Sequence, residues 1–118
     1  MEIEKQRFLV KTYPNLYKQG MSFDCEDGWF DLINDLSSKL EPLILKENEE
    51  IDEDFFCYAT QVKEKFGGLR FYMSTATDQM YELIYDAEDT SLVTCELCGK
   101  PGKINNHAWV TCRCNSCV

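Results

Sequence analysis

Two Cys-x-x-Cys pairs constrain this 118-residue chain more than any other feature. Cys95 and Cys98 form the first pair, Cys114 and Cys117 form the second, and fifteen residues separate them. Two thiolates on one tight turn can point at the same metal ion, and two such turns complete a tetrahedral set. A segment of about 25 residues buries too little apolar surface to fold alone, and metal binding supplies that free energy. The pattern predicts a four-cysteine structural zinc site.

The ligand set has two alternates. Cys112 could replace Cys114, although its spacing to Cys117 is looser, and His107 could replace one of the cysteines. The spacing leaves iron open as the metal. Because four protein ligands close the coordination sphere, we interpret the site as structural and not catalytic. Gly99 and Gly102 suit the tight backbone of such a knuckle.

The charge of the chain is divided unevenly. The formal net charge is −9, but residues 1–94 carry 20 acidic and nine basic residues, and residues 95–118 carry one acidic and three basic residues. An acidic chain does not attract nucleic acid through its overall field, because phosphates require the opposite sign. We predict an acidic body of helices and a hairpin at 1–92, followed by a four-cysteine zinc module at 93–118.

The cysteine count and the hydropathy pattern bear on the compartment. No basic segment followed by an apolar core opens the sequence, and no apolar run approaches the roughly 18 residues of a membrane span. Seven cysteines, an odd number, disfavour a fully paired disulfide framework. We expect a cytoplasmic protein with reduced thiols and no membrane partner.

Hydrophobic periodicity predicts the main helix over roughly 27–44. Its apolar stripe follows a spacing of i, i+4, i+7 and i+11, at Trp29, Ile33, Leu36 and Leu40. Asp27 is placed to cap its start, and Pro42 is expected to end or kink it. The acidic run at 46–54 is interpreted as a solvated loop.

Two further helices, a segment of helical turns and one loop complete the prediction outside the hairpin. A short helix is expected at 3–12, and a longer one at 77–90 with Thr77 as its cap. The segment 14–20 is expected to form one or two helical turns closed by a glycine. Residues 21–28 are expected to form a loop.

Residues 55–75 read as a β-hairpin, because Gly67-Gly68 suits a two-residue turn. This register pairs the residues of a mostly apolar face as Phe66–Leu69, Glu64–Phe71 and Val62–Met73. It pairs the polar face as Lys65–Arg70, Lys63–Tyr72 and Gln61–Ser74. The predicted fold is therefore α+β, with helices packed on a β-hairpin or small antiparallel sheet and a C-terminal zinc-ribbon-like module.

Three stretches resemble a family of small phage and prophage zinc-binding proteins without an established activity. They are Tyr-Pro-Asn-Leu-Tyr at 13–17, Cys-Glu-Asp-Gly-Trp-Phe at 25–30 and Val-Lys-Glu-Lys-Phe-Gly-Gly-Leu-Arg-Phe-Tyr at 62–72. In that family a Cys-x-x-Cys module, a tryptophan and a final Cys-x-x-Cys follow in this order. Here Trp109 precedes the last pair. The resemblance implies a phage context and favours Cys114 over Cys112 as a ligand.

A basic patch on the polar hairpin face is the main candidate for partner binding. It consists of Lys63, Lys65, Arg70 and Tyr72. In the predicted register Lys65 faces Arg70, and like charges across a hairpin are unfavourable. A phosphate, a carboxylate or an acidic protein surface would offset this cost. The simpler alternative is a solvated face neutralised by the acidic run of the chain itself.

Other polar and aromatic groups receive structural interpretations. The carboxylates around Trp29 suit helix capping better than acid–base chemistry; they are Asp24, Glu26, Asp27 and Asp31. Trp29 and Phe30 are expected in the core, and Cys25 and Cys57 as buried thiols. The chain has a single histidine and no recognisable catalytic constellation, so we expect no enzyme.

These features favour a non-enzymatic phage or prophage accessory protein that binds a protein partner, such as a host or defence factor. The alternative is a nucleic-acid-binding zinc protein that adds Lys100, Lys103 and Arg113 to the basic patch. A remote alternative is a carboxylate-based enzyme with its site between Asp24 and Asp31.

Overall fold

The computed structural model describes residues 1–106 and 109–118 and has the predicted α+β architecture. Three α-helices lie beside a three-stranded sheet of order β1-β2-β3, and a separate two-stranded ribbon follows near the C-terminus. Within the described residues the elements are α1 (Ile3–Thr12), β1 (Phe23–Asp24), the 3-10 turn η1 (Asp27–Trp29), α2 (Phe30–Asn48), the 3-10 turn η2 (Glu53–Phe55), β2 (Ala59–Lys65), β3 (Gly68–Met73), α3 (Asp78–Ser91), β4 (Lys103–Asn105) and β5 (Thr111–Arg113).

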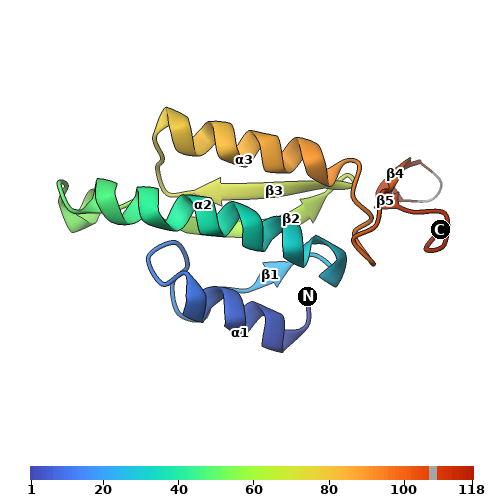
Figure 1. The fold of residues 1–118 in the computed structure, drawn as a ribbon, viewed down its shortest axis with the longest axis horizontal. Coiled ribbons are helices and arrows are strands. Elements are labelled where there is room, and N and C mark those ends of the chain that lie inside the picture. The colour runs from blue at the N-terminus through green and yellow to red at the C-terminus, as the bar shows by residue number, and fades with distance from the viewer. Residues whose placement is uncertain (107–108) are drawn as a thin grey trace.

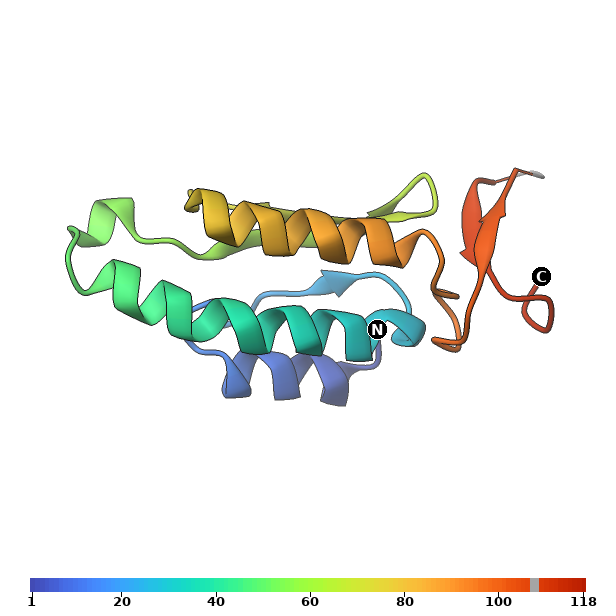
Figure 2. The same ribbon diagram turned by 45° about the horizontal axis from the view of Figure 1, so that its top comes forward.

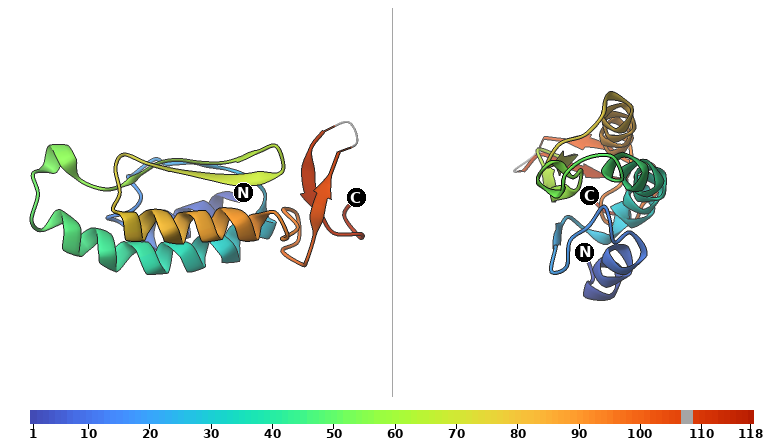
Figure 3. Two further views of the ribbon diagram at one scale, coloured as in Figure 1. Left: turned by 90° about the horizontal axis from the view of Figure 1, so that it is seen from above. Right: turned by 90° about the vertical axis from the view of Figure 1, so that its left-hand side faces the viewer.

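The helices cover one face of the sheet, and the β4–β5 ribbon extends from one end of the molecule (Figures 1 and 2). The colours show that α2 and α3 run in opposite directions, and α1 lies against α2. The end-on view places the sheet on one side of the helical layer, with its second face outward (Figure 3). No helix in the described part of the chain is long and apolar enough to cross a bilayer.

Neighbouring strands bring apolar residues to one face of the sheet and charged residues to the other. Phe23, Val62 and Phe71 form one row across the three strands and are all buried. The next row consists of Asp24, Lys63 and Arg70. Because side chains alternate between faces along a strand, these charged residues lie on the outward face.

The hairpin has a different turn from the predicted one. Its two-residue turn is Phe66-Gly67, with φ of 53° and 82°, as a type I′ turn requires. The register is therefore Glu64–Leu69, Val62–Phe71 and Lys63–Arg70, and Lys65 lies opposite Gly68. The predicted pairs, including Lys65–Arg70, are wrong. Because the shift is an even one, Val62 and Phe71 keep the apolar face and Lys63 and Arg70 keep the polar face, but Phe66 leaves the apolar face for the turn.

Residues 21–28 are not entirely loop, as β1 pairs in parallel with β2. A strand of two residues has no detectable alternation, and its pairing depends on a segment almost 40 residues away. The preceding segment makes the single helical turn that the sequence allowed, with the Tyr17 N–H donating to the Tyr13 carbonyl over 3.0 Å. Gly20 follows this turn with a φ of 81°.

The helix α2 passes through Pro42 and continues to Asn48, so the expected end near residue 44 is wrong. Burial of Ile44 and two hydrogen bonds hold the segment beyond the proline. The Asn48 amide accepts from the Cys57 N–H at 2.9 Å and donates to the Cys57 carbonyl at 3.3 Å. Tertiary contacts thus maintain a helix against the local cost of proline.

Capping was predicted correctly for α3 and wrongly for α2. The Thr77 hydroxyl accepts from the Met80 N–H, as expected. The Asp27 carboxylate instead accepts from the Glu2 N–H at 2.7 Å and lies 3.5 Å from the Lys5 ammonium. The hydrogen bond from Glu2 holds the pKa of Asp27 below its usual value. This side chain therefore anchors the start of α1.

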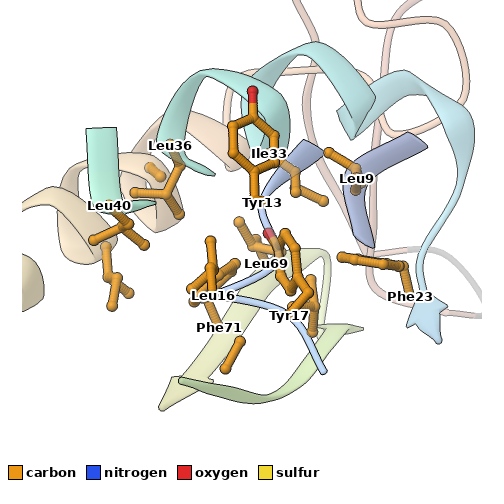
Figure 4. Close-up of a cluster of buried hydrophobic side chains, with 14 of the residues drawn as sticks. Leu9, Tyr13, Leu16, Tyr17, Phe23, Ile33, Leu36, Leu40, Leu69 and Phe71 are labelled. Carbon is orange, nitrogen blue, oxygen red and sulfur yellow. The ribbon is translucent and has the colours of Figure 1, made fainter. Parts of the chain in front are cut away.

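The core lies between the helical layer and the sheet (Figure 4). Trp29 is fully buried, Phe30 packs against the core, and Cys25 and Cys57 are buried, all as predicted. Burial raises the pKa of Cys25 to about 12, so this thiol is protonated. The Tyr17 ring also enters the core, where its hydroxyl lies 2.6 Å from the Ser37 Oγ.

Replacement of Pro42 by alanine should raise the free energy of unfolding by about 1–3 kcal/mol, because the helix regains a backbone donor and loses a steric clash. Urea unfolding measures the change. Pro14→Ala is the matched control: Pro14 lies outside the α-helices, and its replacement should be neutral or slightly destabilising. Equal effects of both substitutions would contradict this account of α2.

Candidate metal centre

The first cysteine pair lies on a tight knuckle directly after α3. The Cys95 N–H donates to the Lys100 carbonyl at 2.7 Å, and the Gly99 N–H donates to the Cys95 carbonyl at 2.9 Å. Gly99 has a φ of 81°, a conformation that side chains disfavour. An added Cβ on Gly102 would lie 2.9 Å from the Cys95 nitrogen. Both glycines therefore shape the turn that presents the two thiols.

The second pair lies on the turn after β5, where the Cys117 N–H donates to the Cys114 carbonyl at 3.1 Å. The ligand atoms of all four predicted cysteines, Cys95, Cys98, Cys114 and Cys117, lie within 4.8 Å of one another. The Cys98 and Cys114 sulfurs are 3.6 Å apart. Sulfurs bound at about 2.3 Å around a tetrahedral ion are separated by about 3.8 Å. The cluster could therefore hold one metal ion.

The four thiols divide into two acidic and two weakly acidic groups. Although burial opposes it, hydrogen bonds from the backbone N–H groups of Cys114, Cys98 and Leu97 lower the pKa of Cys95 to about 6. The pKa of Cys114 is also lowered, against burial, by its hydrogen bond with Cys117. Hydrogen bonds with the Cys114 and Cys98 side chains raise the pKa of Cys117 to about 12. Without a cation the cluster therefore retains protons that a metal must displace.

Of the two alternate ligands, the structure describes only Cys112. Cys112 is completely buried, belongs to the hydrophobic core, and its thiol donates to the Leu92 carbonyl at 3.2 Å. It stands outside the group of four cysteines that share a potential metal position. His107 lies outside the described residues. The geometry thus agrees with Cys114, and not Cys112, as the third ligand.

A close backbone contact attaches the first knuckle to the start of α2. The Gly28 N–H donates to the Glu96 carbonyl at 2.6 Å, and an added Cβ on Gly28 would lie 2.3 Å from that oxygen. The Trp29 indole N–H donates to the Thr94 carbonyl at 2.9 Å. Only glycine allows this approach. From the Asp-Gly-Trp motif the sequence predicts a helix start and a core residue, but not this docking role.

The turn of the β2–β3 hairpin packs against the β4–β5 ribbon (Figures 2 and 3). An added Cβ on Gly67 would lie 2.8 Å from the Ile104 side chain and 3.2 Å from the Thr111 carbonyl carbon. One on Gly68 would lie 3.1 Å from the Leu92 side chain. The two glycine-containing motifs and the cysteine knuckles thus meet at the same end of the molecule. The sequence signal for this junction was a glycine next to an aromatic residue in each motif, Gly28 beside Trp29 and Gly67 beside Phe66.

Glu96 is a buried carboxylate at this junction that the sequence analysis did not single out. The residue is 5% exposed, and its Oε2 accepts from the Glu26 N–H at 3.1 Å. Burial raises the pKa of Glu96. Nearby, the Arg113 Nε is buried and has no hydrogen-bond partner among the described residues.

The residues of the predicted basic patch are on one face but not in the predicted arrangement. Lys63 lies directly opposite Arg70 on the outward face of the sheet, and Tyr72 lies opposite Gln61 and is 41% exposed. Lys65 is exposed beside the turn, with its ammonium 5.7 Å from the Phe66 ring centroid. Lys63 has replaced Lys65 as the cross-strand neighbour of Arg70.

The predicted carboxylate group does not share one environment. Asp24 lies in β1 on the outward face, Asp27 binds the start of α1, and Asp31 is exposed in the first turn of α2. Glu26 lies beside Glu96.

Comparison of the chain with protein-family models, with curated proteins and with solved structures found no match.

Substitution of Cys98 by serine should abolish stable metal binding, because the ion would lose one of four thiolate ligands. Cys112→Ala should retain one ion per chain, because the Cys112 thiol faces the Leu92 carbonyl. Native mass spectrometry measures both stoichiometries. Loss of the ion in the Cys112 variant alone would reverse the ligand assignment.

Metal affinity should rise at least a hundredfold per pH unit between about pH 7 and 8. The pKa values of Cys98 and Cys117 are both raised above the ordinary value, so at least these two thiols must lose protons when the ion binds, and affinity falls as the pH falls. Competition with a chelator of known pH dependence measures the slope. A slope of about four protons would mean that the metal-free cluster is not preformed.

Proposed function

We propose that the four-cysteine cluster holds zinc as a structural ion. All four positions of a tetrahedral ion would be occupied by thiolates, an arrangement typical of structural zinc and without an open position for a substrate. The ion would neutralise part of the thiolate charge and link the turn after α3 to the turn after β5. Elemental analysis of the purified protein distinguishes zinc from iron, and a stoichiometric iron content would contradict this assignment.

We further propose that the protein is a non-enzymatic phage or prophage accessory protein that binds a protein partner through the outward face of its sheet. The observation that carries this proposal is the direct opposition of Lys63 and Arg70 across two strands. Like charges in this position destabilise a sheet. Asp24 is the neighbour of Lys63 on β1, but neither basic residue makes an ion pair within 4.0 Å among the described residues.

An acidic protein surface would offset the repulsion between these two side chains. Tyr72 adds an exposed aromatic side chain to the same face, and aromatic and arginine side chains are enriched at protein interfaces. The phage context rests on the resemblance of the three sequence stretches. A host or defence factor is the class of partner that this context favours.

The charge-reversed variant Lys63→Glu/Arg70→Glu tests the face. Metal-loaded, tagged protein is used for affinity capture from host lysate at several salt concentrations, followed by identification of specific proteins. We expect the wild-type protein to retain an acidic partner and the variant to lose it. The capture should weaken as salt increases, because exposed charges are screened.

The matched control is Lys39→Glu/Lys46→Glu, which makes the same change of charge on exposed positions of α2. This control should retain the partner. Unchanged capture by a folded Lys63/Arg70 variant, or equal loss in both variants, would refute the assigned face. Salt-sensitive binding of purified protein to DNA or RNA, lost in the same variant, would support the nucleic-acid alternative instead.

A further inference from the structure

A cavity of about 450 Å³ lies between the hairpin turn and the β4–β5 ribbon, separate from the outward sheet face and from the four sulfurs. Its chemically distinctive lining consists of three carboxylates, one guanidinium and two aromatic rings: Glu26, Glu64, Glu96, Arg113, Phe66 and Trp109. The lining therefore has two more negative charges than positive ones.

Glu96 is the most buried of the three carboxylates that line the cavity. The residue is only 5% exposed, yet it forms no ion pair within 4.0 Å among the described residues, and Arg113 attracts it from beyond that distance. Only its Oε2 has a hydrogen-bond partner there, the Glu26 N–H. Buried charges in proteins are ordinarily paired. A cation in this cavity would supply the missing partner.

Two exposed aromatic side chains border the same cavity. Trp109 is 81% exposed and Phe66 is 68% exposed, unlike the completely buried Trp29. Phe66 occupies the turn with a positive φ, which is unfavourable for a bulky residue. Ring faces attract ammonium and guanidinium groups, tryptophan most strongly. Carboxylates and exposed rings in one cavity are therefore complementary to an organic cation.

We propose that this cavity receives a lysine or arginine side chain of a partner protein, with Glu96 as its ion-pair partner and Trp109 and Phe66 against its alkyl or planar part. The negative charge of the lining is independent of the proposed protein-binding function. The choice of a protein side chain as the bound cation rests on that proposed function. The partner thus combines a basic side chain for the cavity with an acidic surface for the sheet face.

The test is an NMR titration of the metal-loaded protein with blocked tripeptides, acetyl-Gly-Arg-Gly-amide and acetyl-Gly-Lys-Gly-amide. Shifts of the Trp109 indole N–H and of the backbone amides of Glu96 and Arg113 report occupation of the cavity. We expect saturable shifts at these positions with at least one basic peptide. The uncharged acetyl-Gly-Gln-Gly-amide should produce none.

Glu96→Gln should weaken binding about tenfold or more, because it removes the charge and retains a carbonyl acceptor for the Glu26 N–H. Glu26→Gln and Trp109→Ala are variants at exposed side chains and should weaken binding without loss of the fold. The matched control is Glu50→Gln, at an exposed position after α2, which should bind as the wild type does.

Absence of saturable shifts with both basic peptides, or equal binding by Glu96→Gln and the wild type, would overturn the proposal. Spermidine provides a further arm: about tenfold tighter binding of this free polyamine than of either peptide would overturn the choice of a protein side chain and assign the cavity to a small molecule. These probes do not involve the sheet face. Their failure therefore leaves capture through Lys63 and Arg70 intact, and failure of that capture leaves this titration interpretable.

Discussion

The contact between Gly28 and the backbone of the first cysteine knuckle is the constraint on which the cysteine-rich end of the molecule depends. A side chain on Gly28 would overlap the Glu96 carbonyl oxygen, so the two segments can approach only without one. The contact sets the position of Cys95 relative to α2 and turns the Glu96 side chain toward Glu26. The four-cysteine cluster and the acidic cavity thus share one backbone junction.

The same end of the molecule is also reached by the hairpin, which connects the junction with the sheet. Gly67 fits against the β4–β5 ribbon at the tip, and the two strands of the hairpin carry Lys63 and Arg70 on the outward face. The helices bury the other face, because Val62 and Phe71 occupy the inward row. The hairpin therefore links the two proposed sites: Lys63 and Arg70 lie on its outward face, and Glu64, on its other face, lines the cation cavity.

Much of the secondary structure was predictable because its signals are local. The cap at Thr77 and the buried stripe on α2 depend on residues within a few positions of one another. The predictions failed where contacts between residues far apart in the chain determine the secondary structure. Asn48 sustains α2 beyond Pro42 through a contact with Cys57, and β1 exists only because β2 lies beside it. The predicted turn was Gly67-Gly68, but Phe66-Gly67 forms the turn, and Gly67 packs against the β4–β5 ribbon.

For the site, the sequence by itself determined which groups could bind a metal: four thiols in two Cys-x-x-Cys pairs, because each pair is presented by a turn of a few residues. Which cysteine is excluded was a tertiary decision, since Cys112 is drawn into the core by the packing of β5. The cross-strand neighbour of Arg70 and the burial of Glu96 were decided in the same way. Both depend on contacts between segments far apart in the chain, and no local pattern records such contacts.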